Sequence, residues 1–201
     1  ANTCDPLFDA WREAFQQASV DVTEDYNGAN GAGLGRSQYT IRNGRRSSSA
    51  NAFLRPAESR PNLKVETNAL TTRVIMEGTK AKGVAYTHHG MLVEAFADSE
   101  VILAAGTFNT PQLLMLSGIG PAAHLRDTGI APLLDLPVGK NLQDHLAALI
   151  MFTRPTNTSP FRETMRFDRI AWGMIQAYFF GSGAGTVVPG GSHAFIKTSP
   201  D

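Results

Sequence analysis

Residues 101–120 read VILAAGTFNTPQLLMLSGIG, in which an apolar run is followed by a glycine and then by a helical pattern. The apolar run, residues 101–105, predicts a buried strand that ends at Gly106. In an α/β sheet, ligands collect beyond the carboxyl ends of strands, and a glycine lets a bulky ligand approach the backbone closely. The end of this strand is therefore a candidate cofactor contact.

The helical part of the stretch carries its own start signal. Asn109 or Thr110 can cap a helix, and Pro111 suits the first helical turn because its missing N–H has no partner there. The sequence therefore predicts a strand, a glycine turn and a capped helix in that order.

The same stretch resembles the second signature of the glucose-methanol-choline (GMC) oxidoreductases, which are FAD-dependent enzymes that act on alcohols. The residues that match in order and spacing are Gly106, Thr107, Thr110, Pro111, Leu113, Leu114, Ser117, Gly118, Ile119 and Gly120. Three flanking segments look like this family too: residues 42–57 (RNGRRSSSANAFLRPA), 61–78 (PNLKVETNALTTRVIMEG) and 136–146 (LPVGKNLQDHL). The resemblance covers nearly the whole chain, thins before Gly33 and is nearest to the choline dehydrogenase-like bacterial branch.

Short β segments dominate the middle of the chain. They are predicted at residues 63–66, 69–76, 83–86, 92–96 and 101–105, with turns chiefly at Gly78 and Gly90. This order indicates an antiparallel meander followed by a buried strand. With the resemblance, it predicts a mixed α/β fold that holds the second half of an FAD-binding Rossmann-like domain and part of a substrate-binding domain.

Outside the meander, helical and strand patterns are mixed. Helices are predicted at residues 6–20, 47–54 and 161–180, strands at 37–42, 146–152 and 192–196, and a turn at Asn43 and Gly44. We expect residues 1–45 to form substrate-domain or lid elements, residues 46–145 to belong to the FAD-binding domain, and residues 146–201 to begin the substrate-binding domain.

Four residues are the candidate cofactor contacts. Ala104, Ala105 and Gly106 match the small-residue strand end that approaches FAD in the family, and small side chains allow such an approach. Thr71 aligns with a position, usually valine, whose main chain contacts the adenine side of FAD in the relatives. The resemblance places the phosphate-binding glycine loop, the first signature and the histidine base outside these residues, so no catalytic residue is assigned here.

The histidines suggest catalytic or metal-binding sites, but their positions in the sequence have simpler structural explanations. His88 and His89 form a pair, but they precede Gly90 in a predicted hairpin, where polar residues are common. We interpret them as solvated turn residues. The remaining histidines, which lack metal-ligand spacing, are His124, His145 and His193. No metal site is predicted.

Other polar and glycine-rich segments also have structural interpretations. Glycines 31, 33 and 35 lack the strand and helix of a dinucleotide loop, which favours a flexible loop. Glycines 181, 183 and 185 follow a helix and indicate a cap and loop. Serines 47–49 lack a nucleophile elbow, so hydrolase chemistry is not expected. In residues 141–145 (NLQDH), Asn141 and Asp144 are expected to hydrogen-bond loops together.

Composition favours a small-molecule partner. Hydrophobic residues make up 42% of the 201-residue chain, and 18 basic residues balance 18 acidic ones, which indicates no nucleic-acid or membrane surface. No window approaches the roughly 20 apolar residues of a membrane span, and Cys4 alone forms no internal disulfide. Because the chain starts at Ala1 and stops after a strand-like run, we interpret it as an internal fragment, inactive alone, of unassigned localisation.

Three functional interpretations follow. The leading one is part of an FAD-dependent alcohol dehydrogenase or oxidase, which passes a hydride from a choline-like or other primary alcohol to the flavin, with an unidentified electron acceptor. A hydroxynitrile lyase-like enzyme, which holds FAD without using its redox chemistry, is the second, because fold alone does not fix the reaction. The third is a non-catalytic truncated product. Reduction of the flavin by an alcohol separates the first two.

Overall fold

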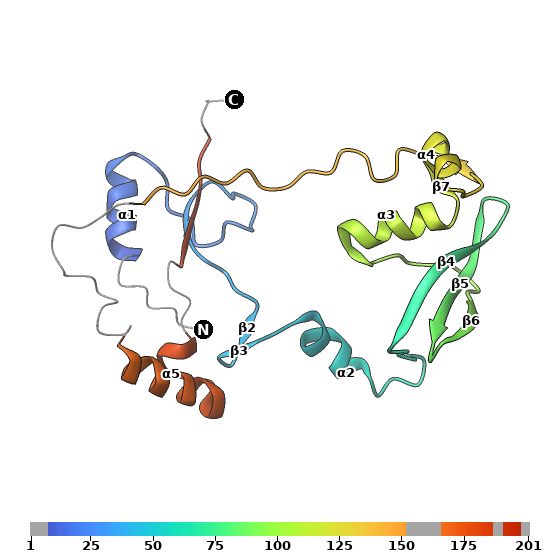
Figure 1. The fold of residues 1–201 in the computed structure, drawn as a ribbon. Coiled ribbons are helices and arrows are strands. Elements are labelled where there is room, and N and C mark those ends of the chain that lie inside the picture. The colour runs from blue at the N-terminus through green and yellow to red at the C-terminus, as the bar shows by residue number, and fades with distance from the viewer. Residues whose placement is uncertain (1–7, 152–165, 187–190, 198–201) are drawn as a thin grey trace. The chain divides into compact units, whose positions relative to one another are not determined.

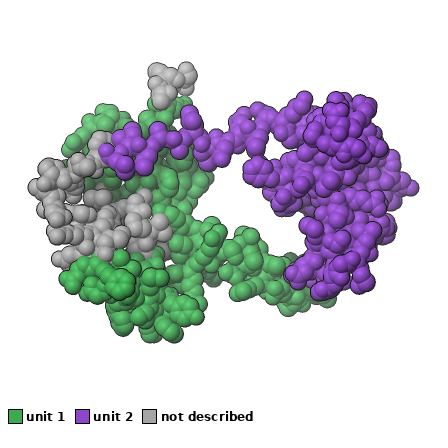
Figure 2. Space-filling model, in the orientation of Figure 1, with its two compact units in different colours: residues 1–63, 152–201 green, residues 64–151 purple. Residues whose placement is uncertain are grey.

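The structure is a computed structural model that describes residues 8–151, 166–186 and 191–197. The chain forms two compact units (Figures 1 and 2). Unit 1 combines Ala1–Leu63 with Phe152–Asp201, and unit 2 is Lys64–Met151. Residues 161–165 of the predicted helix 161–180, and Phe152 of the predicted strand 146–152, lie outside the described residues.

Unit 2 is built on the predicted meander, of which three of the four predicted strands are confirmed. Its strands, β4 (Ala69–Glu77), β5 (Lys80–His88) and β6 (Met91–Phe96), pair as a three-stranded antiparallel sheet in the order β4-β5-β6. Gly78 and Gly90 make the two turns with φ of +58° and +79°, the left-handed region that glycine adopts readily.

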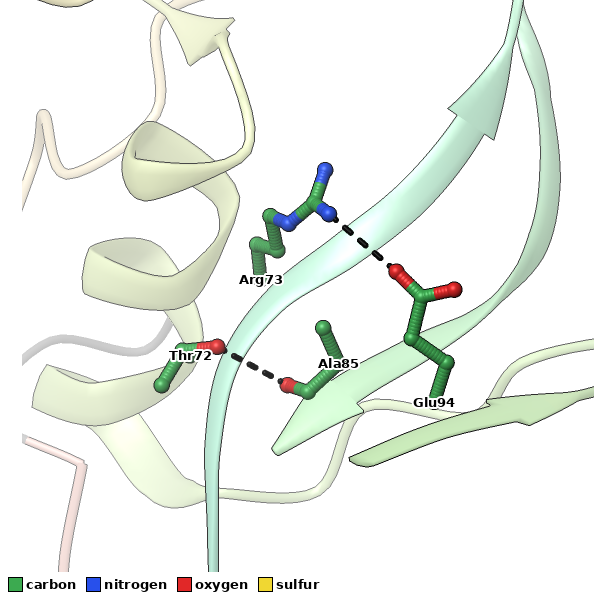
Figure 3. Close-up of polar contacts among 4 residues, drawn as sticks. All are labelled: Thr72, Arg73, Ala85 and Glu94. Carbon is green, nitrogen blue, oxygen red and sulfur yellow. Dashed lines mark hydrogen bonds and ion pairs between the residues drawn. The ribbon is translucent and has the colours of Figure 1, made fainter. Parts of the chain in front are cut away.

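A β-bulge bends strand β4 near its start. Thr71 pairs with Tyr86 and Arg73 pairs with Ala85, so Thr72 has no partner in the register. The Thr72 hydroxyl instead donates to the Ala85 carbonyl at 3.1 Å, as Figure 3 shows. An extra residue of this kind bends the strand and increases its twist.

Helix α3 (Gly106–Leu116) packs against β4 and buries Leu113. The predicted start at Asn109 or Thr110 is wrong, because the left-handed Gly106 (φ +93°) already turns the chain into the helix. The Thr110 hydroxyl accepts a hydrogen bond from the Ala105 amide at 3.0 Å. Pro111 therefore lies inside the helix rather than in its first turn.

Three predicted strands are not strands in the structure. Residues 63–66, 101–105 and 146–151 have no regular secondary structure. A strand exists only when a neighbour completes its ladder of hydrogen bonds, and within the described residues of unit 2 no strand pairs with any of these segments. Residues 101–105 are apolar, as a buried strand requires, but no described strand forms with them the hydrogen-bonded pair that the prediction assumed.

The end of the signature stretch, after α3, begins a small substructure of two short strands and one helix. Strand β7 (Ile119–Gly120) pairs in parallel with β8 (Leu134–Asp135), and helix α4 (Ala122–Asp127) lies between them in sequence. Gly118 has a φ of +81°. A Cβ atom on it would lie 2.9 Å from the Ala131 carbonyl oxygen, so this position admits no side chain.

Unit 1 contains an antiparallel pair of strands that are distant in sequence. Strand β1 (Gly33–Arg36) pairs with β9 (Ser192–Phe195), so the prediction of a loop at glycines 33 and 35 is wrong. Their place in a strand depends on a partner some 160 residues away, as Gly33 opposite Phe195 shows. The predicted strand 192–196 is confirmed as β9, whereas residues 37–40 of the predicted strand 37–42 lie outside any strand.

Unit 1 has a helix in each of the three predicted segments, but the helix predicted at residues 47–54 begins at Ala50 and continues to Ala57. The helical elements are α1 (Phe8–Gln17), a π-helical turn (Ala50–Leu54) that leads into α2 (Arg55–Ala57), α5 (Phe167–Phe180) and a 3-10 turn (Ala184–Thr186). Gly181 caps α5 with a φ of +61°, as predicted. In α1, Phe8 is buried but Trp11 is 49% exposed, so its aromatic residues are only partly core.

The predicted Asn43-Gly44 turn is confirmed. It joins β2 (Ile41–Arg42) to β3 (Arg45–Arg46), and both turn residues have positive φ, 52° and 68°, as a two-residue hairpin of the I′ type requires. The turn lies directly against the cap of α5: a Cβ atom on Gly44 would overlap the Gly181 carbonyl oxygen.

Candidate cofactor site

A cavity of about 640 Å³ lies in unit 2. Its walls are formed by the first residues of β4, by two paired positions of β5 and β6, by residues 100–105 and by one face of α3. This volume is within the range of roughly 300 to 1,000 Å³ that is typical of small-molecule sites. The side chains are mainly apolar, with a few polar groups, which are Thr71, Glu100, Asn109 and Gln112.

The cavity brings together the predicted contact residues from separate parts of the chain. Thr71 lines it from β4, and Ala104 and Ala105 line it from the segment before α3. Gly106 follows that segment directly as the first residue of the helix. Residues some thirty positions apart in sequence therefore meet at one site because α3 packs against β4.

Gly106 leaves the backbone accessible at this point. Apart from its two chain neighbours and the nearby backbone of α3, no atom of the described residues lies within 4 Å of the position that a Cβ atom on Gly106 would occupy, and its φ of +93° disfavours any other residue. Small side chains precede it in Ala104 and Ala105. Open space beside bare backbone is the arrangement that fits the close approach of a large planar group.

The rim of the cavity is unusually apolar and exposed. Leu70, Phe96 and Ile102 line the cavity and expose 71%, 70% and 78% of their surface. Exposed apolar patches of this kind mark places where a ligand or another part of a protein packs. The described residues thus form one open side of a site rather than a closed pocket.

Ser117 is a residue of this region that sequence reasoning missed. The resemblance includes it among the residues of the GMC signature, but its position after the last turn of α3 gave no signal of a structural role. Its hydroxyl donates to the Leu113 carbonyl at 2.6 Å and accepts from the Val74 amide at 2.8 Å. Ser117 therefore joins the end of α3 to the middle of β4.

The histidine pair lies at a turn, as predicted. His88 ends β5, and His89 has a φ of +50° in the turn before β6. The two rings lie 4.2 Å apart between centroids, and the His88 Nε2 atom is 3.5 Å from a Glu66 carboxylate oxygen. Neither residue lines the cavity described above.

The NLQDH segment makes local hydrogen bonds. The Gln143 amide donates to the Asn141 side chain at 3.1 Å, and the Asp144 carboxylate accepts from the His145 amide at 2.7 Å. In the described part of the chain, no group of three or more His, Cys, Asp or Glu side chains is arranged to hold a metal ion. No helix among the described residues has the length and hydropathy of a membrane span.

Comparison with known proteins gives consistent matches. The family described as GMC oxidoreductase matches residues 1–147. Mitochondrial choline dehydrogenase from Homo sapiens is 44% identical over 198 residues, which are 97% of this chain and 33% of that protein. Oxygen-dependent choline dehydrogenase from Brucella suis biovar 1 (strain 1330) is 42% identical over 194 residues, 96% of this chain and 35% of that protein.

The solved structures show the same relationship. An FAD-dependent oxidoreductase from Chaetomium thermophilum superposes on 91% of this chain with a TM-score of 0.73 and 27% identity, and the match covers 33% of that chain. This chain therefore spans about a third of the length of the curated relatives that it matches.

Proposed function

Because this chain belongs to the GMC oxidoreductase family, we propose that the protein is an FAD-dependent oxidoreductase that acts on the CH–OH group of an alcohol. One observation carries the proposal: relatives named choline dehydrogenases are more than 40% identical to the chain over nearly all of its residues. The cavity in unit 2 supports it independently, since its size and apolar walls suit a large planar cofactor.

Four residues of unit 2 are proposed to contact FAD. Ala104, Ala105 and Gly106 would let the cofactor approach the backbone before α3, and the Thr71 main chain would face its adenine side. Support comes from the common cavity of Thr71, Ala104 and Ala105, and from the open space at Gly106.

In the proposed reaction, this chain holds the cofactor in position and shields it. Bound FAD supplies the hydride acceptor in such an oxidation. The apolar side chains around the cavity, Leu70, Phe96 and Ile102 among them, would keep water away from the cofactor. No residue of this chain is assigned as the base that takes the alcohol proton.

We also propose that residues 46–145 belong to the FAD-binding domain and that residues 1–45 and 146–201 belong to the substrate-binding part. The pairing of β1 with β9 supports the second assignment, because it joins one strand from each of those two segments. The proposed substrate is choline or another small primary alcohol, after the names of the relatives.

Anaerobic mixing of the full-length protein with an alcohol tests the proposal. We expect choline to bleach the yellow absorbance of the bound flavin, and trimethylglycine, which has no hydroxyl group, to leave it unchanged. A flavin that no member of a panel of primary alcohols reduces would contradict alcohol oxidation. A protein that holds no flavin at all would contradict the cofactor assignment as well.

A further inference from the structure

The β-bulge at Thr72 lies directly beside the proposed cofactor contact. Thr71, which lines the cavity, is the last residue in register before the bulge, and Arg73 is the first one after it. The pairing on either side of Thr72 is thus offset by one residue. A bulge bends its strand and increases the local twist, and Ala69, Leu70 and Thr71, which lie just before the bulge, all line the cavity. The position of the bulge therefore sets how this end of β4 lies along the cavity.

A side-chain hydroxyl holds the bulge on the side of β5. The partly buried Thr72 hydroxyl donates to the Ala85 carbonyl at 3.1 Å, and it supplies a cross-strand bond at the β4 position that the ladder skips (Figure 3). Ala85 itself is fully buried. Without the hydroxyl, this carbonyl would lose a partner in a site that water reaches poorly.

A second hydroxyl holds the strand on the side of α3. The Ser117 hydroxyl accepts from the Val74 amide two residues beyond the bulge, and it is anchored by its own bond to the Leu113 carbonyl. Leu113 lines the cavity from α3. The two hydroxyls therefore fix the bulge from both neighbours, the strand β5 and the helix α3.

We propose that Thr72 and Ser117 are positioning residues that hold β4 in the bend in which Thr71 forms the adenine-side wall of the FAD site. This inference rests on the proposed function. Neither hydroxyl needs to touch the cofactor. They act through the strand, by preventing Thr71 from turning away from the cavity.

The test compares binding of FAD and of FMN, which lacks the adenine part, to the apo form of the full-length protein. Thr72→Val removes the hydroxyl and keeps the shape of the side chain. We expect it to raise the Kd for FAD about three- to tenfold and to leave the Kd for FMN within a factor of two. Thr72→Ser restores the hydroxyl, and we expect it to recover most of the FAD affinity.

Thr87→Val is the matched control. Thr87 lies in β5 with intermediate exposure, and its hydroxyl makes no hydrogen bond to the described residues. The same substitution there should leave binding of both flavins unchanged. Ser117→Ala should act in the same direction as Thr72→Val, and it provides the decisive measurement if the Thr72 variant does not fold.

The outcomes separate the inference from the function on which it rests. An unchanged Kd for FAD in Thr72→Val and Ser117→Ala, or an equal loss for FAD and FMN, would overturn the positioning role while the proposed function stands. Failure of the wild-type protein to bind FAD would overturn the proposed function itself.

Discussion

The Arg45 guanidinium donates a hydrogen bond of 2.9 Å to the Tyr178 carbonyl, and this bond ties a hairpin to a helix end 133 residues later in the chain. The carbonyls of the last helical turn lack partners within the helix, and the helix dipole concentrates negative charge there. The Arg45 guanidinium at the end of α5 supplies a donor for one of these carbonyls and a positive charge that is attracted to the negative end of the dipole. The bond therefore joins the two sequence segments that make up unit 1.

We expect Arg45→Gln to lower the free energy of unfolding of unit 1 by about 1 kcal/mol, because it removes a charge-assisted bond at the end of α5. The two tryptophans of the chain, Trp11 and Trp172, both belong to unit 1, so their fluorescence during urea unfolding reports on this unit. Arg42→Gln is the control, since Arg42 is exposed in the same hairpin and its side chain makes no ion pair or hydrogen bond to the described residues. Equal effects of both variants would contradict a specific role for Arg45.

Substitution of Gly106 should remove the flavin. In the full-length protein, Gly106→Val fills the open space beside the backbone and strains a residue with a φ of +93°. Gly129→Val is a matched control, because Gly129 also has a positive φ (+77°) and open space but lies away from the cavity. We expect flavin content, measured from the absorbance of the purified protein, to fall only in the Gly106 variant. Normal flavin content in a folded Gly106→Val protein would remove this residue from the site.

The histidine pair should be dispensable for chemistry. Asn tolerates the left-handed backbone that His89 adopts, so the double variant His88→Asn, His89→Asn should fold normally. In the full-length enzyme we expect the rate of flavin reduction by the alcohol to change less than about twofold, since neither ring lines the cavity. Loss of a general base would slow it by about 100-fold or more. Rapid-mixing absorbance measurements distinguish these results, and a drop of that size with intact flavin content would place the base at this turn.

Residues 1–201 expressed alone should retain no flavin. Tight ligand sites bury most of the ligand, whereas Leu70, Phe96 and Ile102 at the rim of the cavity are at least 70% exposed. We expect the purified chain to elute colourless from gel filtration after incubation with FAD. A stoichiometric yellow complex would mean that the described cavity already encloses the cofactor.

Local signals in the sequence predicted those elements whose partners are close in the chain. The meander follows from alternating residues and from turns at Gly78 and Gly90, and the Asn43-Gly44 hairpin follows from its two turn residues. Residues 101–105 show the limit of such signals, because an apolar run predicts a strand but cannot supply the neighbour that a strand requires. The pairing of Gly33 with Phe195 was missed for the converse reason, since nothing near Gly33 indicates so distant a partner.

The candidate site shows a similar division. The resemblance indicated Thr71, Ala104, Ala105 and Gly106, and three of these line one cavity. Thr72 and Ser117 were missed because their roles depend on a shift in register and on contacts between a helix and a strand. Neither feature leaves a periodic pattern in the sequence.

The contact between Gly44 and Gly181 limits how this protein can vary. Each residue has a positive φ, and a side chain on either one would strike backbone atoms of the other segment, as the overlap of a Gly44 Cβ with the Gly181 carbonyl shows. A second substitution can make a clashing side chain smaller, but it cannot remove clashing backbone atoms. We therefore expect a library that randomises the neighbours of Gly44 to contain no mutation that compensates for Gly44→Ala. Evolved variants of unit 1 should accordingly keep both Gly44 and Gly181.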